Sequence, residues 1–121
     1  MAITKQAVTI LAAANVPAGT TAAAPVAGAA VDVRAFAGGE WAYKISNGAS
    51  APTTPATMVL QTSHDGTNWY DYFTVGGAAG ASGVSSSSVN LSAGVMYVRA
   101  IAYGNTTNAV TVESYLQAKV G

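Results

Sequence analysis

The chain has 121 residues, which suffices for one domain with its own hydrophobic core and is too short for a second one. Charged residues make up only 8% of the sequence, against about 25% in ordinary globular domains, and five basic side chains balance five acidic ones. There is no cysteine, which excludes disulfides, thiolate metal sites and cysteine nucleophiles.

The low charge also bears on the partners that the protein can have. No run of Lys and Arg is present that could replace the counterions of phosphates, so we expect no nucleic-acid partner. No stretch approaches the roughly 20 apolar residues of a transmembrane helix, so we expect no membrane partner. A neutral surface does little to keep copies apart, which favours assembly with neighbouring proteins.

The first 30 residues differ from the rest of the chain. From residue 12 to 30 they are almost all Ala, Gly, Pro, Thr and Val, without charge or periodicity. Such a segment can lie extended along a partner, and a long ordinary loop is the other interpretation. We therefore predict an extended N-terminal strand or arm over residues 1–30 and a β-sandwich domain over residues 31–121. The candidate partner contacts in the arm are Val16, Pro17, Pro25 and Val26.

Alternating apolar and polar residues predict about eight strands and no amphipathic helix. The clearest strand is Glu40–Ser46, in which Trp41, Tyr43 and Ile45 share one face. The preceding residues 31–34 also alternate, and Gly38-Gly39 supplies a turn, so these two segments are predicted to form a hairpin.

The strongest hairpin signal joins Thr57–Ser63 to Asn68–Val75 through a connection that contains Asp65-Gly66, a pair that accepts positive φ. On its second strand, strict alternation places Trp69, Asp71, Phe73 and Val75 on one face and both tyrosines on the other.

The remaining residues are predicted to form a loop and a final hairpin. The Gly, Ala and Ser stretch 76–88 is expected to be a flexible loop before a short strand that ends at Leu91. Residues 94–103 and 109–120 are expected to pair with each other, and the last strand is expected to place Val110, Val112, Leu116 and Val120 on its inner face. The predicted fold class is an all-β, antiparallel β-sandwich of about eight strands, either jelly-roll or immunoglobulin-like, with the strand order open.

No residue emerges as catalytic, cofactor-binding or metal-binding. His64 lies beside Asp65 in a turn, which provides neither a positioned nucleophile nor an orienting carboxylate. The Asp65, Asn68 and Asp71 spacing does not match a calcium-binding loop. We therefore expect no cofactor, no metal and no enzymatic activity.

Aromatic side chains offer one alternative to a purely structural role. A set of exposed rings could stack on sugars, since their faces are apolar and their edges form hydrogen bonds. The candidate glycan-stacking residues are Tyr70, Tyr72 and Tyr103.

Two sequence motifs resemble a known group of proteins. The first is the hairpin Val59–Val75 with its Ser-His-Asp-Gly-Thr-Asn-Trp turn, and the second is the later strand Gly94–Asn105 with its Tyr-Val-Arg-Ala run. Together they resemble small β-sandwich structural proteins of tailed bacteriophages, over roughly the C-terminal half of the chain.

The resemblance implies a component of the virion. The expected role is that of a capsid decoration, or cement, protein that binds the major capsid protein or another virion protein, stabilises the shell and forms a homotrimer. The alternative is a tail or fibre accessory module that binds host-surface carbohydrate.

Overall fold

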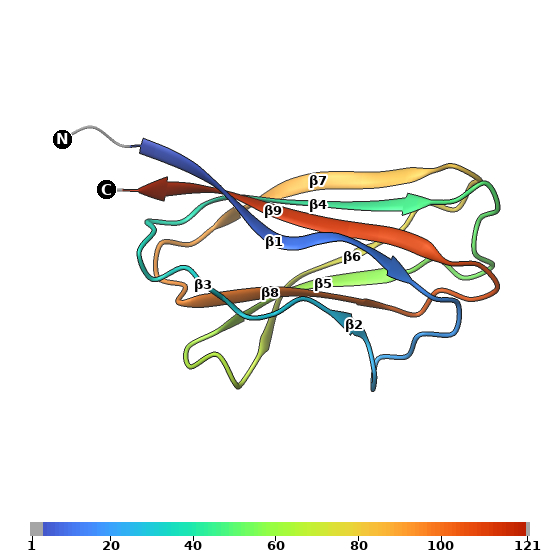
Figure 1. Cartoon of the computed structure of the whole chain (residues 1–121), viewed down its shortest axis with the longest axis horizontal. Coiled ribbons are helices and arrows are strands. Elements are labelled where there is room, and N and C mark those ends of the chain that lie inside the picture. The colour runs from blue at the N-terminus through green and yellow to red at the C-terminus, as the bar shows by residue number, and fades with distance from the viewer. Residues whose placement is uncertain (1–3, 121) are drawn as a thin grey trace.

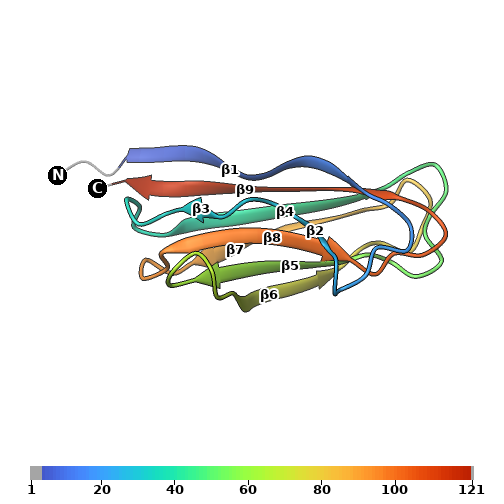
Figure 2. The same ribbon diagram turned by 60° about the horizontal axis from the view of Figure 1, so that its bottom comes forward.

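The computed structural model describes residues 4–120, and in this range the chain is entirely β and irregular structure. No helix that could cross a membrane occurs among these residues. Two antiparallel sheets pack face to face (Figures 1 and 2), which confirms the predicted β-sandwich. The strands are β1 (Thr4–Val16), β2 (Val26–Ala27), β3 (Val31–Asp32), β4 (Gly39–Asn47), β5 (Thr57–Ser63), β6 (Tyr70–Gly76), β7 (Val84–Leu91), β8 (Tyr97–Tyr103) and β9 (Val110–Val120).

The strand order selects one of the two topologies left open by the sequence. One sheet has the order β1-β9-β4-β7 and the other β2-β8-β5-β6, with β3 also paired to β8. Because β2 and β3 both pair with β8, they act as one interrupted strand, and the chain then has eight strands. The first pairs with the last, the second with the next to last, and so on inward to the β5–β6 hairpin. This nested pairing is the jelly-roll topology.

The core lies between the two sheets and follows the alternation of the sequence. In β4, Trp41 and Ile45 are fully buried, and Tyr43 between them is nearly so. In β9, Val112 and Leu116 point into the same core. Most of the alternate, inward residues of these central strands are apolar because their side chains face the opposite sheet, and Asn47 and Ser114 are the polar exceptions. The predicted inward faces of both strands are confirmed.

The predicted hairpin between residues 31–34 and 40–46 is wrong, and the Gly38-Gly39 pair between them has another role. Residues 31–32 pair with β8 in one sheet, whereas β4 pairs with β7 and β9 in the other. The turn therefore carries the chain from sheet to sheet. Both glycines adopt positive φ, and a Cβ on Gly39 would lie 2.1 Å from the carbonyl oxygen of Gln117 in β9. Only glycine allows β9 to approach this closely.

Two further expectations for the C-terminal half are also wrong. Strands β8 and β9 belong to different sheets, so they do not form a hairpin. The stretch 76–88, expected as a loop, contains the first part of β7, so the short strand predicted to end at Leu91 begins earlier, at Val84, and pairs with β4 from Gly39↔Leu91 to Ser46↔Val84. Serine is not a strong strand former, and the partner strand supplies the hydrogen bonds that fix this segment.

The N-terminal segment lies along other strands of its own chain. Strand β1 pairs with β9, and β2 pairs with β8. Ile10, Leu11 and Val16 belong to the core. The part of the predicted arm before Thr4 lies outside the described residues.

A buried polar contact ties the two central strands of the first sheet together. The indole N–H of Trp41 donates a hydrogen bond to Ser114 Oγ at 2.7 Å, and Ser114 Oγ donates to the carbonyl oxygen of Ala42 at 2.9 Å. Both Trp41 and Ser114 are fully buried. The serine hydroxyl thus satisfies a donor that water cannot reach.

We expect Ser114→Ala to lower the free energy of unfolding by about 1–3 kcal/mol, because the substitution leaves the indole N–H buried without an acceptor. Urea unfolding followed by tryptophan fluorescence measures this loss. The matched control is Ser88→Ala on the exposed face of β7, which should change stability by less than about 0.5 kcal/mol. Equal losses in the two variants would contradict this role of Ser114.

Candidate functional site on the outer face of the second sheet

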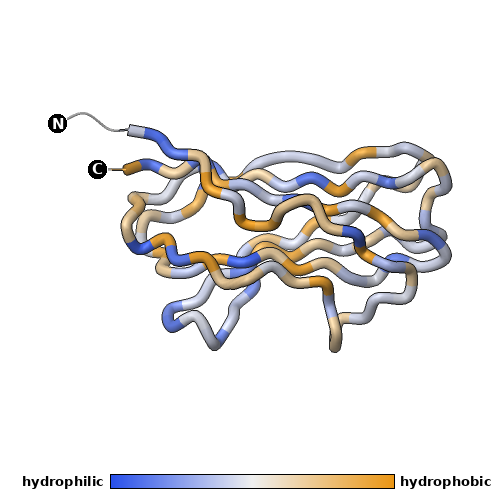
Figure 3. Tube along the Cα trace, in the orientation of Figure 1, coloured by the Kyte–Doolittle hydropathy of each residue, from blue (hydrophilic) through white to orange (hydrophobic). Residues whose placement is uncertain are grey.

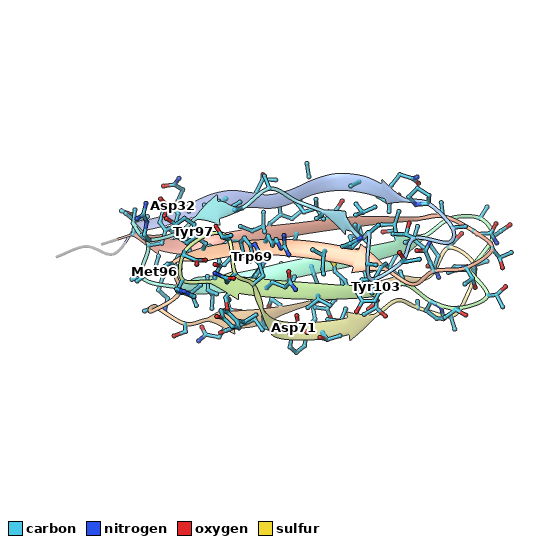
Figure 4. The ribbon with its side chains drawn as sticks, turned by 90° about the horizontal axis from the view of Figure 1, so that it is seen from below. Asp32, Trp69, Asp71, Met96, Tyr97 and Tyr103 are labelled. Carbon is cyan, nitrogen blue, oxygen red and sulfur yellow. The ribbon has the colours of Figure 1, made fainter. Side chains whose placement is uncertain are left out.

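The outer face of the β2-β8-β5-β6 sheet carries a group of aromatic, amide and charged side chains in contact with one another. Along β8, the inward residues Val98, Ala100 and Ala102 alternate with outward ones. Val59 and Ile101, also outward, are buried at 2% and 8% exposure and lie apart from the main core. The centre of the outer face is therefore apolar, and its two side chains, Val59 and Ile101, are shielded from solvent. Figure 4 shows Trp69 over the middle of this face, Tyr97 and Asp32 toward one end and Tyr103 at the other.

A chain of polar contacts crosses three neighbouring strands of this face. Arg99 Nε donates to Gln61 Oε1 at 2.8 Å, and Gln61 Nε2 donates to Asp71 Oδ1 at 3.0 Å. The Arg99 guanidinium lies over the Trp69 ring, 4.5 Å from its centroid. The three polar residues occupy matched positions on β8, β5 and β6, so sheet register aligns them. We refer to Trp69, Arg99, Gln61 and Asp71 as the polar-aromatic row.

Arg99 forms a hydrogen bond with Gln61 in this row and can still bind an additional group. Among residues 4–120, no carboxylate lies within ion-pairing distance of its guanidinium. Partial burial lowers the pKa of Arg99 from its usual value, although an arginine remains protonated. A fixed guanidinium, an amide, a carboxylate and an aromatic ring side by side offer donors, acceptors and an apolar surface to one ligand.

A second arginine–aromatic contact lies near the end of the same face. Asp32 and Arg34 form an exposed ion pair at 2.7 Å, and the Arg34 guanidinium lies 5.1 Å from the centroid of the Tyr97 ring. The hydrogen bonds donated by the Arg34 side chain and backbone N–H lower the pKa of Asp32 to about 2. Both arginines of the face are therefore stacked on aromatic rings.

Two loops project from the sandwich on this side, as Figure 1 shows at its lower edge. One is the β5–β6 turn, and the other is the β1–β2 loop, residues 17–25. Figure 3 shows the β5–β6 turn as hydrophilic and the tip of the β1–β2 loop as hydrophobic. The polar-aromatic row thus lies on a face flanked by two loops of opposite character.

The β1–β2 loop is anchored by a fully buried asparagine. Asn105 Nδ2 donates to the carbonyl oxygen of Val16 at 3.0 Å, and the backbone carbonyl oxygen of Asn105 accepts from the backbone N–H of Gly19 at 2.8 Å. Thr20 closes the start of the loop by donating from Oγ1 to the Pro17 carbonyl at 2.7 Å. These bonds attach the start of the loop to the connection between β8 and β9.

The β5–β6 turn is organised by Asp65, as the sequence predicts. Its carboxylate accepts hydrogen bonds from the backbone N–H groups of Thr67 and Asn68, at 2.9 and 2.8 Å, and from Asn68 Nδ2 at 2.6 Å. These donors lower the pKa of the Asp65 carboxyl far below its ordinary value. The turn leads directly to Trp69.

The three tyrosines proposed for glycan stacking do not converge. Tyr70 is exposed near His64 in a shallow cleft of about 240 Å³ at one end of the sandwich. The Tyr72 hydroxyl donates to the Asn90 carbonyl at 2.7 Å and accepts from the Ser92 N–H, which joins β6 to β7. Tyr70 pairs with Thr62 of β5, and Tyr103 pairs with Thr57 of the same strand. These two positions are five residues, or about 17 Å, apart along β5, so Tyr103 is far from Tyr70.

A β-bulge explains why strict alternation fails in β6. Leu60 pairs with Phe73 and Gln61 pairs with Asp71, so Tyr72 is an extra residue in the strand. The Tyr72 ring lies 6.0 Å from Trp41, and the Phe73 ring lies 6.1 Å from Tyr43. Both rings therefore face the first sheet, and the predicted separation of Tyr72 and Phe73 onto opposite faces is wrong.

The four proposed partner contacts lie at the β1–β2 loop but differ in exposure. Val16 is fully buried, so it is unavailable to a partner. Val26 pairs with β8 and packs against the core. Pro17 is exposed and Pro25 half-buried in the loop itself.

Sequence reasoning missed Arg99 and Gln61. Arg99 is the one charged residue of strand β8, and that position could have marked it; Gln61 is followed by Thr62 and Ser63 and gave no such signal. Their proximity to Asp71 depends on the register of three strands and on the bulge, which the sequence does not display.

Comparisons with known proteins identify similar folds. No family model matches the sequence, and no curated protein matches it. The crystal structure of the SPBc2 prophage-derived protein YomS is similar at a TM-score of 0.50 and 17% identity, covering 96% of this chain and 95% of that one. A chain from the disulfide-linked pili that form Bacillus endospore appendages has a TM-score of 0.47 and 17% identity, covering 94% and 90%. At 17% identity, the similarity to YomS concerns the fold.

The turn residue Asp65 gives a prediction for acid stability. Its pKa is lower in the folded chain than the roughly 3.9 of an unfolded one, so its contribution is complete above about pH 4 and is lost as pH falls toward the folded pKa. We expect Asp65→Asn to make the free energy of unfolding less dependent on pH between about 4 and 2. Urea unfolding at several pH values measures the slope.

A companion variant provides the comparison for this prediction. Asp32, with a folded pKa of about 2, acts in the same direction, so Asp32→Asn should remove a further part of the slope and the double variant should have the flattest profile. Identical slopes for the wild type and Asp65→Asn would contradict the assignment.

Proposed function

We propose that the chain is a non-enzymatic structural protein of a bacteriophage virion, and that it acts as a capsid decoration protein. The observation that carries the proposal is the β1–β2 loop, an uncharged projection held in place by buried Asn105. An uncharged loop whose base is already held by hydrogen bonds loses less conformational entropy when it enters a groove between capsid subunits. The similar protein YomS is prophage-derived, which agrees with a phage origin for this chain.

The mode of action follows from binding energy alone. A protein that binds across neighbouring capsid subunits adds contacts that must break before the shell opens, so it stabilises the closed shell by mass action. A surface with five acidic and five basic side chains presents little repulsion to a dense array of neighbours. Exposed strands such as β7 carry serine hydroxyl groups in place of charges, so they can lie close to neighbouring proteins on the particle without repulsion.

Co-sedimentation with expanded capsids of the phage that encodes the chain tests this function. The wild type should sediment with capsids, and Ala23→Asp at the exposed part of the loop should reduce binding by at least about tenfold, because it would bury an unpaired carboxylate. The matched control is Ala7→Asp on exposed β1, which should bind like the wild type. A wild type that stays in the supernatant would refute the capsid role, and full binding by Ala23→Asp would refute the loop as the contact.

A second function is favoured by the polar-aromatic row. A neutral sugar could stack on Trp69 while Arg99 donates to its hydroxyl groups and Asp71 accepts from them, since the row pairs one positive with one negative group. This proposal assigns host-glycan binding by a tail or fibre module to residues other than the three tyrosines.

A glycan array distinguishes the two functions. If the row binds sugar, the wild type gives a signal that Trp69→Ala and Arg99→Ala abolish. The control Tyr115→Ala, which removes an exposed ring from the other sheet, should leave that signal unchanged. The absence of a wild-type signal, or equal losses in all three variants, would contradict sugar binding by the row.

A further inference from the structure

Strand β7 forms an open edge of the β1-β9-β4-β7 sheet. Its eight residues, Val84–Leu91, contain no charged residue and no proline, and they pair with β4 in one continuous register. Ser86, Ser87 and Ser88 are all exposed. An edge of this kind presents a row of backbone donors and acceptors to any strand that approaches it.

Hydrogen bonds at the two ends of β7 show which backbone groups point outward. The backbone N–H of Asn47 in β4 donates to the carbonyl of Gly83, so residues 83, 85, 87, 89 and 91 direct their backbone groups toward β4. The carbonyl of Asn90 instead accepts from the Tyr72 hydroxyl, outside the sheet. Because the direction alternates along a strand, Ser86 and Ser88 point their N–H and C=O groups to the open edge.

The other edges in the described part of the chain carry features that hinder pairing. Strand β1 has two register shifts and an exposed lysine, Lys5. Strand β6 has a bulge and an exposed aspartate, Asp71. Strand β2 has only two residues. Bulges, charges and short length are the usual protections against edge-to-edge association, and β7 has none of them.

We propose that β7 is a self-association site, at which a second copy of the chain adds its own β7 in antiparallel orientation. The two-fold axis passes through Ser87, so Ser86 of each copy forms hydrogen bonds with Ser88 of the other. This pairing joins two four-stranded sheets into one sheet of eight strands.

A second copy is the occupant that the surface favours. Two identical uncharged edges meet without repulsion, and the chain as a whole carries no net charge. Exposed apolar side chains also lie beside the edge: Val84 in β7 is 51% exposed, and Phe73 in neighbouring β6 is 38% exposed. An isologous contact of this type is closed after two copies, so the inference favours a dimer over the trimer expected from the resemblance. It does not depend on the proposed function.

Engineered cysteines test the register, since the natural chain has none. Residues facing each other at a non-hydrogen-bonded position have Cα atoms about 4.5 Å apart, within the range that a disulfide spans. Ser87→Cys should therefore form a covalent dimer under mild oxidation. Ser85→Cys is the control: the two cysteines would lie about 13 Å apart along the strands and should not cross-link. No cross-link for Ser87→Cys, or equal cross-linking of both variants, would overturn the register.

Light scattering tests the association itself. The wild type should have about twice the 12.0 kDa mass of one chain. Ser86→Pro removes an outward N–H without breaking a bond to β4 and should give a monomer, as should Ser88→Lys, which adds a charge at the edge. Thr111→Lys on exposed β9 of the same sheet is the charge-matched control and should remain dimeric. A monomeric or trimeric wild type, or a dimer that persists in folded Ser86→Pro and Ser88→Lys, would overturn the proposal.

Discussion

The close approach of the last strand to the strand that follows Gly38-Gly39 determines the whole architecture. Strand β9 lies between β1 and β4, and a side chain at Gly39 would collide with the carbonyl of Gln117. Within this contact, Ser114 accepts the indole hydrogen bond of fully buried Trp41. The contact joins the first strand and the last to the middle of the sheet, since β9 pairs with both β1 and β4 and β4 in turn pairs with β7.

The nested pairing also explains why the exposed features are where they are. The innermost hairpin, β5–β6, ends in the Asp65 turn and presents Trp69 to the outer face of the second sheet. The outermost connection, β1–β2, projects from the same side and is held by Asn105. The innermost pairing of the first sheet leaves β7 at an open edge. The polar-aromatic row, the loop and the edge are three separate surfaces, so one small domain can contact several neighbours at once.

Local patterns predicted the elements better than their partners. The β5–β6 hairpin was predicted because its turn chemistry is local, and the central strands were predicted because one side of each must be apolar. The predicted pairings of β3 with β4 and of β8 with β9 are wrong, since strands that are close in sequence belong to different sheets here. Only the end of β7, up to Leu91, was predicted as a strand, because its serines have little strand preference of their own.

The fold class, the inward faces of β4 and β9 and the Asp65 turn could be predicted from the sequence, because each depends on alternation or on hydrogen bonds within a few residues. The strand order, the assembly of Arg99, Gln61 and Asp71, and the position of β7 at an edge became visible in the three-dimensional fold alone. These features join residues that are far apart in the chain. Their positions depend on which strands pair and where a bulge shifts the register, and one extra residue in β6 was enough to turn a side chain to the opposite face.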